Sequence, residues 1–394
     1  MTKKNYLLTV VIPTRNRQEY AIKSLEQVLA QTNDDVEIVL QDNSDDDRLR
    51  QLINNLNSNR IRYNYLNTPL SFVDNFELAV SLARGEYVVL IGDDDAILPN
   101  IIDICYWAKK LNVEAVTSDI LCTYYWPNSG ATNYKCTEDA GYMRVLKADN
   151  NLKIINSKEK LKEVLKNGCQ FYHKSGLPKI YHGIVKREII EDIVKKNGRL
   201  FSGLSPDIYS SFQLALNIKE TYKLNIPFTI DGNCPKSGAG SQAQGKHTGK
   251  LKDAPHFKGH NNYHWDDFVP EVYSIQTIWA DSGLKAIRES NNLDLLKFYS
   301  IHVLTAHTIA FNKGIKYETF KSYIDIMKYN VVIGFIHLIP SFIFSVLPNV
   351  FLRISKRILG RGQVGTIYNN LQDIEKAVDC MLMNEACQTF KGGN

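Results

Sequence analysis

The chain has 394 residues, of which 44% are hydrophobic and 23% are charged, a composition typical of a folded protein. This length predicts one large domain with a substantial appendage. The net charge of +5 is mild and predicts no nucleic-acid partner. The cysteines, 7 in number, include no CxxC pair, which argues against a disulfide framework or a thiolate zinc site and favours a reducing cytoplasm.

Short apolar segments alternate with helical patterns in the N-terminal part of the chain. The first segment, LLTVVI, ends at Pro13 without a small-residue cleavage site, so no signal peptide is expected. The segments that follow read EIVLQD, RIRYNYL, EYVVLIG and EAVTSD. Strands that alternate with helices predict an α/β fold whose mostly parallel sheet is flanked by helices.

The segment SFVDNFELAVSLAR predicts a helix over residues 71–84. Ser71 suits the N-cap position and Gly85 suits the position just after the helix. The helix leads directly into the strand YVVLIG, which is followed by three consecutive aspartates.

Carboxylates follow two of the predicted strands. Asp42 comes after EIVLQ, and Asp93, Asp94 and Asp95 come after YVVLIG. If these strands are parallel neighbours, their acids face one crevice, because ligands of open α/β sheets bind beyond the carboxyl ends of the strands. The triple aspartate suits Mg²⁺ or Mn²⁺ held together with a diphosphate, since these ions prefer oxygen ligands. A solvated turn is the alternative, because Asp favours turns.

A further helix is predicted to begin within SGLSPDIYSSFQLALNIKE. Ser205 can cap it, Pro206 suits its first position, and Asp207 falls in its first turn, where the helix dipole favours an acid. Upstream, His182 in KIYHGIVKRE either faces an acceptor molecule or is a core histidine.

Residues 232–264 are rich in Gly, Lys, Ser and His, which predicts a mobile loop. Loops of this length are often lids, so Lys246, His247 or His256 is expected to reach a bound diphosphate when the loop closes. His256, His260 and His264 are spaced as zinc ligands on a helix would be, but the Gly and Asn residues between them disfavour a helix.

The C-terminal part is helical and amphipathic in pattern over residues 267–330, and an apolar run follows at 331–352. This run is long enough to span a bilayer, but internal Pro, Gly, His and Asn residues interrupt it. An interfacial or re-entrant anchor fits at least as well as a spanning helix, and a buried helical hairpin is the soluble alternative. Basic residues that could contact anionic headgroups follow at Arg353, Lys356, Arg357 and Arg361.

These patterns predict three regions. An α/β domain is expected over residues 1–231, a loop or lid over 232–264, and a helical region over 265–394 that includes an amphipathic membrane-binding segment at 331–361. The protein is expected in the cytoplasm, bound peripherally to the cytoplasmic face of the inner membrane.

Four segments, taken in order, carry a resemblance to a known family: VVIPTRNR, LQDNSDDD, SFVDNFELAVSLARGEYVVLIGDDD and SPD. Together they resemble an inverting glycosyltransferase of family 2 with a GT-A fold, over about residues 7–220. The resemblance implies that one sugar passes from a nucleotide-diphosphate sugar, a UDP-sugar being favoured, to a lipid-linked or cell-surface glycan. The chain lacks the Q-x-x-R-W motif of related processive synthases, which favours a single addition.

The resemblance also implies roles for particular residues. Asp95 and Asp93 would hold Mn²⁺ or Mg²⁺, and Asp207 would be the catalytic base, although the family commonly has an acidic pair where this chain has Pro206 and Asp207. The remaining implied contacts are with the nucleotide-sugar donor: Pro13, Thr14, Arg15, Asp42, Asn43, Asn75, Asp93 and Asp94.

Two other functions are weighed against this one. A nucleotidyltransferase would normally have a Gly-rich loop after the first strand, whereas this chain reads PTRNRQEY there. A degenerate transferase that serves as the membrane scaffold of a polysaccharide complex is disfavoured by the intact triple aspartate and Asp207.

Overall fold

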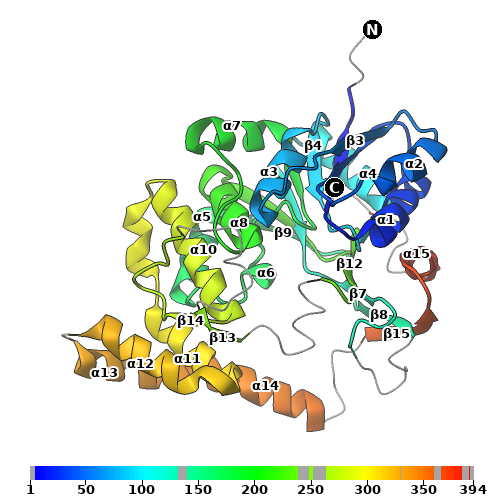
Figure 1. The fold of residues 1–394 in the computed structure, drawn as a ribbon. Helices are drawn as coiled ribbons and strands as arrows, with labels where there is room; N and C mark the ends of the chain where they lie inside the picture. Colours follow the sequence, from blue (N-terminus) through cyan, green and yellow to red (C-terminus); the bar gives the residue numbers. More distant parts are fainter. Residues whose placement is uncertain are drawn as a thin grey trace.

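The computed structural model describes residues 5–131, 140–237, 248–251, 263–328, 330–358, 365–383 and 390. Its centre is an eight-stranded sheet in the order β3-β2-β1-β4-β10-β6-β11-β9 (Figure 1). The bounds of these strands, in that order, are Ile61–Tyr65, Val36–Asp42, Leu8–Thr14, Tyr87–Leu90, Ile184–Lys186, Ala115–Ser118, Glu220–Leu224 and Leu152–Asn156.

The strands that precede the acids are parallel, as predicted, but they are not neighbours. β2 and β4 both pair in parallel with β1, which lies between them. Beyond β4 the sheet is mixed, because β10 runs antiparallel to both β4 and β6. The carboxyl ends of β1, β2 and β4 therefore share one edge of the sheet.

Helices cover both faces of this sheet (Figure 1). Val10 and Ile12 of β1 belong to a core with α1, α2 and α4, whereas Val11 belongs to a core with α3, α7 and α8. A strand buried on both faces has few polar positions, which explains the continuous apolar runs of the sequence. The bounds of these helices are Gln18–Gln31, Arg48–Asn55, Asn100–Lys110, Phe72–Ser81, Arg187–Asn197 and Pro206–Asn217.

A second sheet packs beside the first, in the order β15-β8-β7-β12-β5. Its edge strand β15 comes from the C-terminal part of the chain and pairs with β8, and helix α15 (Ile374–Leu382) follows it. This part of the predicted helical region thus adds a strand to the second sheet (Figure 1). The bounds of the five strands are Gly365–Leu371, Gly141–Leu146, Cys122–Tyr125, Thr229–Asn233 and Ala96–Ile97.

The remaining elements lie to one side of the sheets and below them in the view of Figure 1. A two-stranded sheet, β13 (Gly249–Lys250) with β14 (Val272–Tyr273), lies within this region. The pattern that predicted helices over 267–330 is confirmed by three α-helices, Ile275–Glu289, Ile301–Phe311 and Lys316–Met327. The helical elements are α5 (Ser157–Lys166), α6 (Tyr172–Ser175), α10 (Ile275–Glu289), η3 (Leu293–Phe298), α11 (Ile301–Phe311), η4 (Lys313–Ile315), α12 (Lys316–Met327), α13 (Val331–Ser341), η5 (Phe342–Val346) and α14 (Leu347–Ile358).

The apolar run at 331–352 is helical and exposed. Val331–Phe351 is long and apolar enough to cross a membrane, with a mean hydropathy of 2.1, and 17% of its apolar window is buried. Pro340 lies inside α13, and the π-helical turn η5 follows it, as expected where a proline removes a backbone hydrogen bond. Large side chains point away from the protein, including Phe344 at 78% exposed and Val332 at 75%.

Helix α3 begins as predicted but ends differently. The Ser71 side chain accepts a hydrogen bond from the backbone N–H of Asp74, which confirms the N-cap. The helix ends at Ser81 with Leu82 as its C-cap, so the prediction that Gly85 terminates it is wrong. Gly85 instead lies against β1, and its N–H donates to the Thr9 hydroxyl at 2.7 Å. A glycine is needed here because the backbone of β1 passes close to it, and not because a helix ends here.

Replacing Gly85 with Ala is expected to destabilise the protein. A Cβ at this position would lie 2.5 Å from the Thr9 backbone nitrogen, which cannot yield without moving β1. Overpacking of this kind costs about 1–3 kcal/mol, measurable as a lower midpoint of urea unfolding. Gly314→Ala is the matched control, because no described atom lies within 4 Å of its added Cβ. Equal midpoints for the two variants would contradict the packing argument.

Candidate active site

A cavity of about 710 Å³ opens at the carboxyl ends of β1 and β4. This volume lies within the range of small-molecule binding sites. Its wall includes the turn after β1, the start of α3, the triple-aspartate loop, the start of α8 and the end of β12. The polar lining residues are Thr14, Arg15, Asn16, Arg17, Asn75, Asp94, Tyr181, Asp207, Asp231, Lys236 and Ser237.

Asp93 is fully buried behind the cavity wall. Its carboxylate accepts hydrogen bonds from the Thr14 hydroxyl at 2.6 Å and from Arg17 Nε at 3.1 Å. Arg17 Nη2 lies 2.5 Å from the other carboxylate oxygen. Burial alone would lower the pKa of Arg17, but Asp93 and Asp94 raise it, so the guanidinium stays charged. Asp93 is thus committed to an ion pair inside the protein.

Asp94 lines the cavity and joins the two sheets. Its carboxylate accepts from the backbone N–H of Cys234 at 2.9 Å, and its backbone carbonyl accepts from Trp126 Nε1 at 2.9 Å. Arg17 lies 3.6 Å away. These bonds fix the triple aspartate against the segment that follows β12.

Asp95 is fully buried and accepts from several donors. Its carboxylate receives hydrogen bonds from the N–H groups of Gly92 at 2.5 Å and Gly232 at 2.6 Å, and from the Tyr181 hydroxyl at 2.9 Å. Burial alone would raise the pKa of Asp95, but His182 and the donated hydrogen bonds lower it. The ionised form is therefore the stable one.

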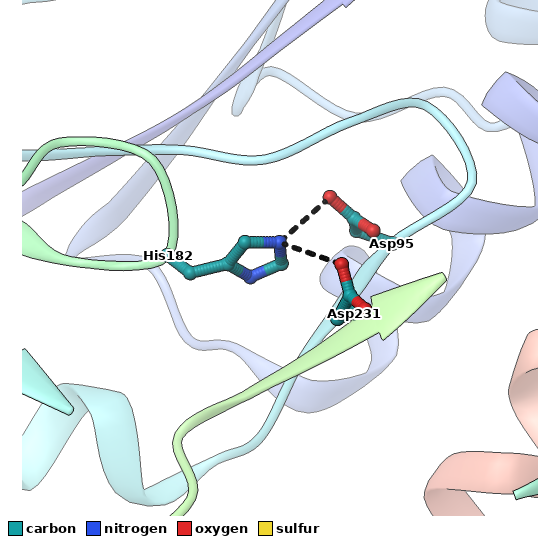
Figure 2. Close-up of side chains that lie close together, drawn as sticks. All are labelled: Asp95, His182 and Asp231. Carbon is teal, nitrogen blue, oxygen red and sulfur yellow. Dashed lines mark ion pairs between the residues drawn. The ribbon is translucent and has the colours of Figure 1, made fainter. Parts of the chain in front are cut away.

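His182 and Asp231 lie next to Asp95 (Figure 2). His182 Nε2 is 3.2 Å from Asp95 Oδ2 and 3.8 Å from Asp231 Oδ1. Burial alone would lower the pKa of His182, but the two carboxylates raise it. Burial raises the pKa of Asp231 to about 7. His182, for which the sequence left two possibilities, contacts the triple aspartate.

Asp207 lies in the first turn of α8, as predicted, and lines the cavity. Pro206 occupies the first helical position, whereas the Ser205 side chain makes no capping hydrogen bond to any described residue. Burial raises the pKa of Asp207 to about 6, with Asp95 acting in the same direction and His182 opposing. A carboxylate with this pKa can take up a proton near neutral pH.

Among the residues predicted to contact a donor, Pro13, Thr14, Arg15 and Asn75 line the cavity. Asn75 Nδ2 donates to the Thr14 carbonyl at 3.3 Å, and its buried Oδ1 has no hydrogen-bond partner among the described residues. Arg15 is exposed and donates to the Leu70 carbonyl at 2.8 Å. An unpaired buried oxygen at a cavity wall is available to a ligand.

Asp42 and Asn43 are buried at the end of β2 and are not among the described lining residues. Asp42 accepts from the Tyr63 hydroxyl at 2.9 Å. Asn43 donates to the Leu66 carbonyl at 2.6 Å and the Thr68 carbonyl at 2.8 Å. The Asn43 side chain thus holds the segment between β3 and α3, whereas the Asp42 side chain contacts β3 itself. Their predicted contacts with a base and ribose stay predictions.

The expected lid residues Lys246, His247 and His256 lie outside the described residues, as does His260, while His264 is exposed. The described start of the predicted loop does reach the site. Lys236 lines the cavity and pairs with Glu19 at 2.8 Å.

Comparison with known proteins identifies the domain that carries the N-terminal part of this site, which includes the triple aspartate. The model of the family described as glycosyl transferase family 2 matches residues 9–174. These residues belong to glycosyl transferase family 2. The family 2 domain contains β1, β2, β4 and the triple aspartate, so the resemblance seen in the sequence and the predicted GT-A α/β fold are confirmed.

Curated relatives of the family 2 domain are bacterial. The chain is 37% identical over 102 residues to a putative colanic acid biosynthesis glycosyl transferase, WcaA, of Escherichia coli, covering 25% of this chain and 36% of the relative. It is 23% identical over 197 residues to glycosyltransferase GlyG of Streptococcus pneumoniae, covering 50% and 62%. The chain thus spans less than two thirds of the length of either relative.

Among solved structures, S. aureus TarS in complex with UDP-GlcNAc is 13% identical, with a TM-score of 0.48, over 85% of this chain and 89% of that chain.

The donor atoms next to the cavity fit a divalent cation. The side chains of Asp95, His182 and Asp231 each offer one ligand atom, and these atoms lie within 4.8 Å of one another. His182 Nε2 is buried without a hydrogen-bond partner among the described residues. Carboxylate oxygens with an imidazole nitrogen are a donor set used for Mn²⁺ and Zn²⁺.

Sequence reasoning missed Arg17, Asp231 and Tyr181. Asp231 follows a short β-rich segment, TI, in a region with no recognisable motif, and its partner His182 is far away in the chain. The only signal for Arg17 was its place two residues after Arg15 in the PTRNR turn.

Proposed function

We propose that the protein is a metal-dependent inverting glycosyltransferase, which transfers one sugar from a nucleotide-diphosphate sugar to a lipid-linked or cell-surface glycan. The observation that carries the proposal is a cavity at the strand ends of the family 2 domain, lined both by Asp94 of the triple aspartate and by Asp207. A UDP-sugar is the favoured donor. A relative named as a GalNAc(5)-diNAcBac-PP-undecaprenol glucosyltransferase, from Campylobacter jejuni and 32% identical over 97 residues, supports a lipid-linked acceptor.

Asp207 supplies the base in this proposal. In an inverting transfer, the acceptor hydroxyl oxygen bonds to the anomeric carbon as the bond from that carbon to the diphosphate breaks on the opposite face. The Asp207 carboxylate takes the hydroxyl proton. Its place in the cavity wall, at a helix start fixed by Pro206, supports this role.

The leaving diphosphate requires positive charge. Arg15, Arg17 and Lys236 line the cavity, and cations aimed at the developing charge stabilise the transition state. Asp95 with His182 and Asp231 would hold Mn²⁺ or Mg²⁺, and a bound ion of this kind neutralises charge on the departing diphosphate.

The transfer rate is expected to fall at acid pH. Burial raises the pKa of Asp207 to about 6, and a base acts only when deprotonated. kcat/KM should therefore be level above this pKa and fall about tenfold per pH unit below it. A divalent cation nearby stabilises the ionised carboxylate, so it can only lower the pH at the midpoint of the pH–rate profile. A pH–rate profile at saturating Mn²⁺ checks this, and a midpoint well above 6 would contradict the assignment.

The exposed apolar helix supports a place on the cytoplasmic face of the membrane. Val331–Phe351 exposes a row of large apolar side chains to solvent, which is costly in water. The sequence of α14 then supplies Arg353, Lys356 and Arg357, whose charge suits an anionic lipid surface. Docking there would concentrate a lipid-linked acceptor near the cavity.

Phe344→Glu is expected to weaken binding to anionic lipid vesicles by roughly tenfold or more, because a buried phenyl group contributes about 1.5–3 kcal/mol. Flotation of the full chain with phosphatidylglycerol vesicles measures this. Met383→Glu is the matched control, since Met383 is 84% exposed and lies outside the apolar helix, whereas Phe344 is 78% exposed. An equal loss of vesicle binding in both variants, or no vesicle binding by the wild type, would contradict membrane binding through this helix.

A donor panel tests the activity itself. The purified chain would be incubated with Mn²⁺ and UDP-, GDP-, CDP- or dTDP-sugars, with undecaprenyl-diphosphate sugars as acceptors, and nucleoside diphosphate release would be measured. We expect one donor class to be consumed, with inversion at the anomeric carbon detected by NMR. Pyrophosphate release from a nucleoside triphosphate and a sugar phosphate would favour a nucleotidyltransferase. No turnover of any donor by folded protein would favour the scaffold function.

A further inference from the structure

His182 is held in an unusual conformation next to Tyr181, which lines the cavity. Its backbone φ is 55°, a left-handed value that costs free energy for a residue with a side chain. Its N–H donates to the Leu90 carbonyl at 3.0 Å, so the residue is anchored at the end of β4. Strain of this kind persists where the surrounding structure enforces it, often at functional sites.

The imidazole ring is fixed as a metal ligand would be. Nδ1 lies 3.0 Å from the Thr229 hydroxyl, which can accept its proton and leave the lone pair on Nε2. Nε2 points between Asp95 and Asp231 (Figure 2) and has no hydrogen-bond partner among the described residues. His182 is 2% exposed, so water does not readily satisfy this nitrogen.

The spacing of the three ligand atoms fits one ion. First-row divalent metals lie about 2.0–2.2 Å from nitrogen and oxygen ligands, so two ligands at right angles are roughly 3 Å apart and opposed ligands roughly 4 Å apart. The observed separations from Nε2 are 3.2 Å to Asp95 Oδ2 and 3.8 Å to Asp231 Oδ1. An ion among these atoms would need only small side-chain shifts.

Neighbouring groups favour the same arrangement. Gly92, Gly232 and Tyr181 donate to the Asp95 carboxylate and hold it in place, as outer partners of metal ligands do. Asp231 lines the cavity, so further coordination positions would open toward a bound diphosphate. Asp93, in contrast, lies against the Arg17 guanidinium, which repels a cation.

We propose that Asp95, His182 and Asp231 together form the binding site for one Mn²⁺-class divalent cation, and that Asp93 is not a ligand. The inference rests on the proposed function for the role of the ion, but the ligand set is a separate claim. It replaces the aspartate pair expected from the sequence with one aspartate of the triple and two side chains from distant segments. The imidazole favours Mn²⁺ over Mg²⁺, which prefers oxygen ligands only.

Electron paramagnetic resonance of Mn²⁺ with the full chain tests the ligand set. The wild type should bind about one Mn²⁺, with or without UDP, and its electron spin echo should be modulated by a ¹⁴N nucleus. His182→Gln should abolish that modulation and weaken Mn²⁺ binding roughly tenfold or more. Asp231→Asn should weaken binding while keeping the modulation. Unchanged circular dichroism would show that the variants are folded.

Two control variants sharpen the test. His173 also has a buried ring nitrogen without a hydrogen-bond partner among the described residues, but it packs against Trp279 rather than carboxylates, so His173→Gln should bind Mn²⁺ as the wild type does. Asp93→Asn should likewise keep the ¹⁴N modulation and the Mn²⁺ affinity.

The outcomes separate this inference from the proposed function. Modulation that survives His182→Gln, or a wild type that binds no Mn²⁺ even with UDP, overturns the ligand set. Sugar transfer in the donor panel would still stand in that case. Conversely, if Mn²⁺ binds through His182 but the protein turns over no donor, the ligand set is supported and the proposed transferase activity is contradicted.

Discussion

Asp207→Asn is expected to reduce sugar transfer by about 10²–10⁴-fold, the usual contribution of a general base. Asparagine has nearly the same shape but cannot accept the proton of the acceptor hydroxyl. Asp207 lies at the start of α8, whereas the predicted nucleotide contacts Pro13, Thr14 and Arg15 lie at the end of β1 and in the turn after it, so nucleotide binding should be retained. Steady-state kinetics and nucleotide titration on the same preparation check both expectations.

Two further variants make this prediction specific. Ser205→Ala should transfer sugar at the wild-type rate, because the Ser205 side chain makes no capping hydrogen bond to the described residues. Asp231→Asn tests the other cavity carboxylate whose pKa is raised by burial. Unchanged turnover in Asp207→Asn would refute the base assignment. Full loss of turnover in Asp231→Asn alone, at a Mn²⁺ concentration that saturates that variant, would move the role of base to Asp231.

Deletion of residues 365–394 is expected to unfold the second sheet. β15 is the edge strand that pairs with β8, and Leu371, Ile374 and Met381 are buried in the core beneath it. Each fully buried apolar side chain contributes roughly 1.5–3 kcal/mol, so the combined loss is comparable with the total stability of a domain. The truncated chain should show a large drop in melting temperature or fail to fold.

The deletion should also disturb the cavity. β12, in the same sheet as β15, carries Asp231, and the segment after it binds Asp94 through the Cys234 N–H. Nucleotide binding should therefore be lost together with stability. Removal of residues 391–394 is the control, since it spares β15, α15 and Phe390, which packs on Trp107. A 365–394 deletion that melts and binds nucleotide like the full chain would contradict the role given to the tail.

Local patterns were sufficient to predict the first strands and several helix starts of the fold. LLTVVI, EIVLQD and YVVLIG became β1, β2 and β4 because continuous apolar runs of this length suit strands buried on both faces. Ser71 and Pro206 predicted helix starts for two reasons. A serine side chain can accept a hydrogen bond from an otherwise unpaired N–H group of the first turn, and a proline has no N–H group to leave unpaired. Gly85 was misinterpreted, because its constraint comes from Thr9 on another strand.

The site was only partly predictable because its contacts are non-local. Asp95 and Asp207 stand in recognisable positions, but Asp231 reaches the site through β12, whose pairing with β5 and β7 no local pattern encodes. The association of β15 with β8 across the helical region is likewise set by tertiary packing. The neutralisation of Asp93 by Arg17 depends on geometry that spacing alone does not give.

The most direct test of the central claim is a calorimetric titration of UDP, GDP, CDP and dTDP, with Mn²⁺, into the wild type and Asn75→Leu. Asn75 lines the cavity and has an unpaired buried oxygen, and leucine has a similar size. If the cavity is the donor site, one nucleotide binds the wild type with a stoichiometry of about one and binds Asn75→Leu at least about tenfold more weakly. Absence of binding by all four nucleotides, or equal affinity in the two proteins, would contradict a donor site in this cavity.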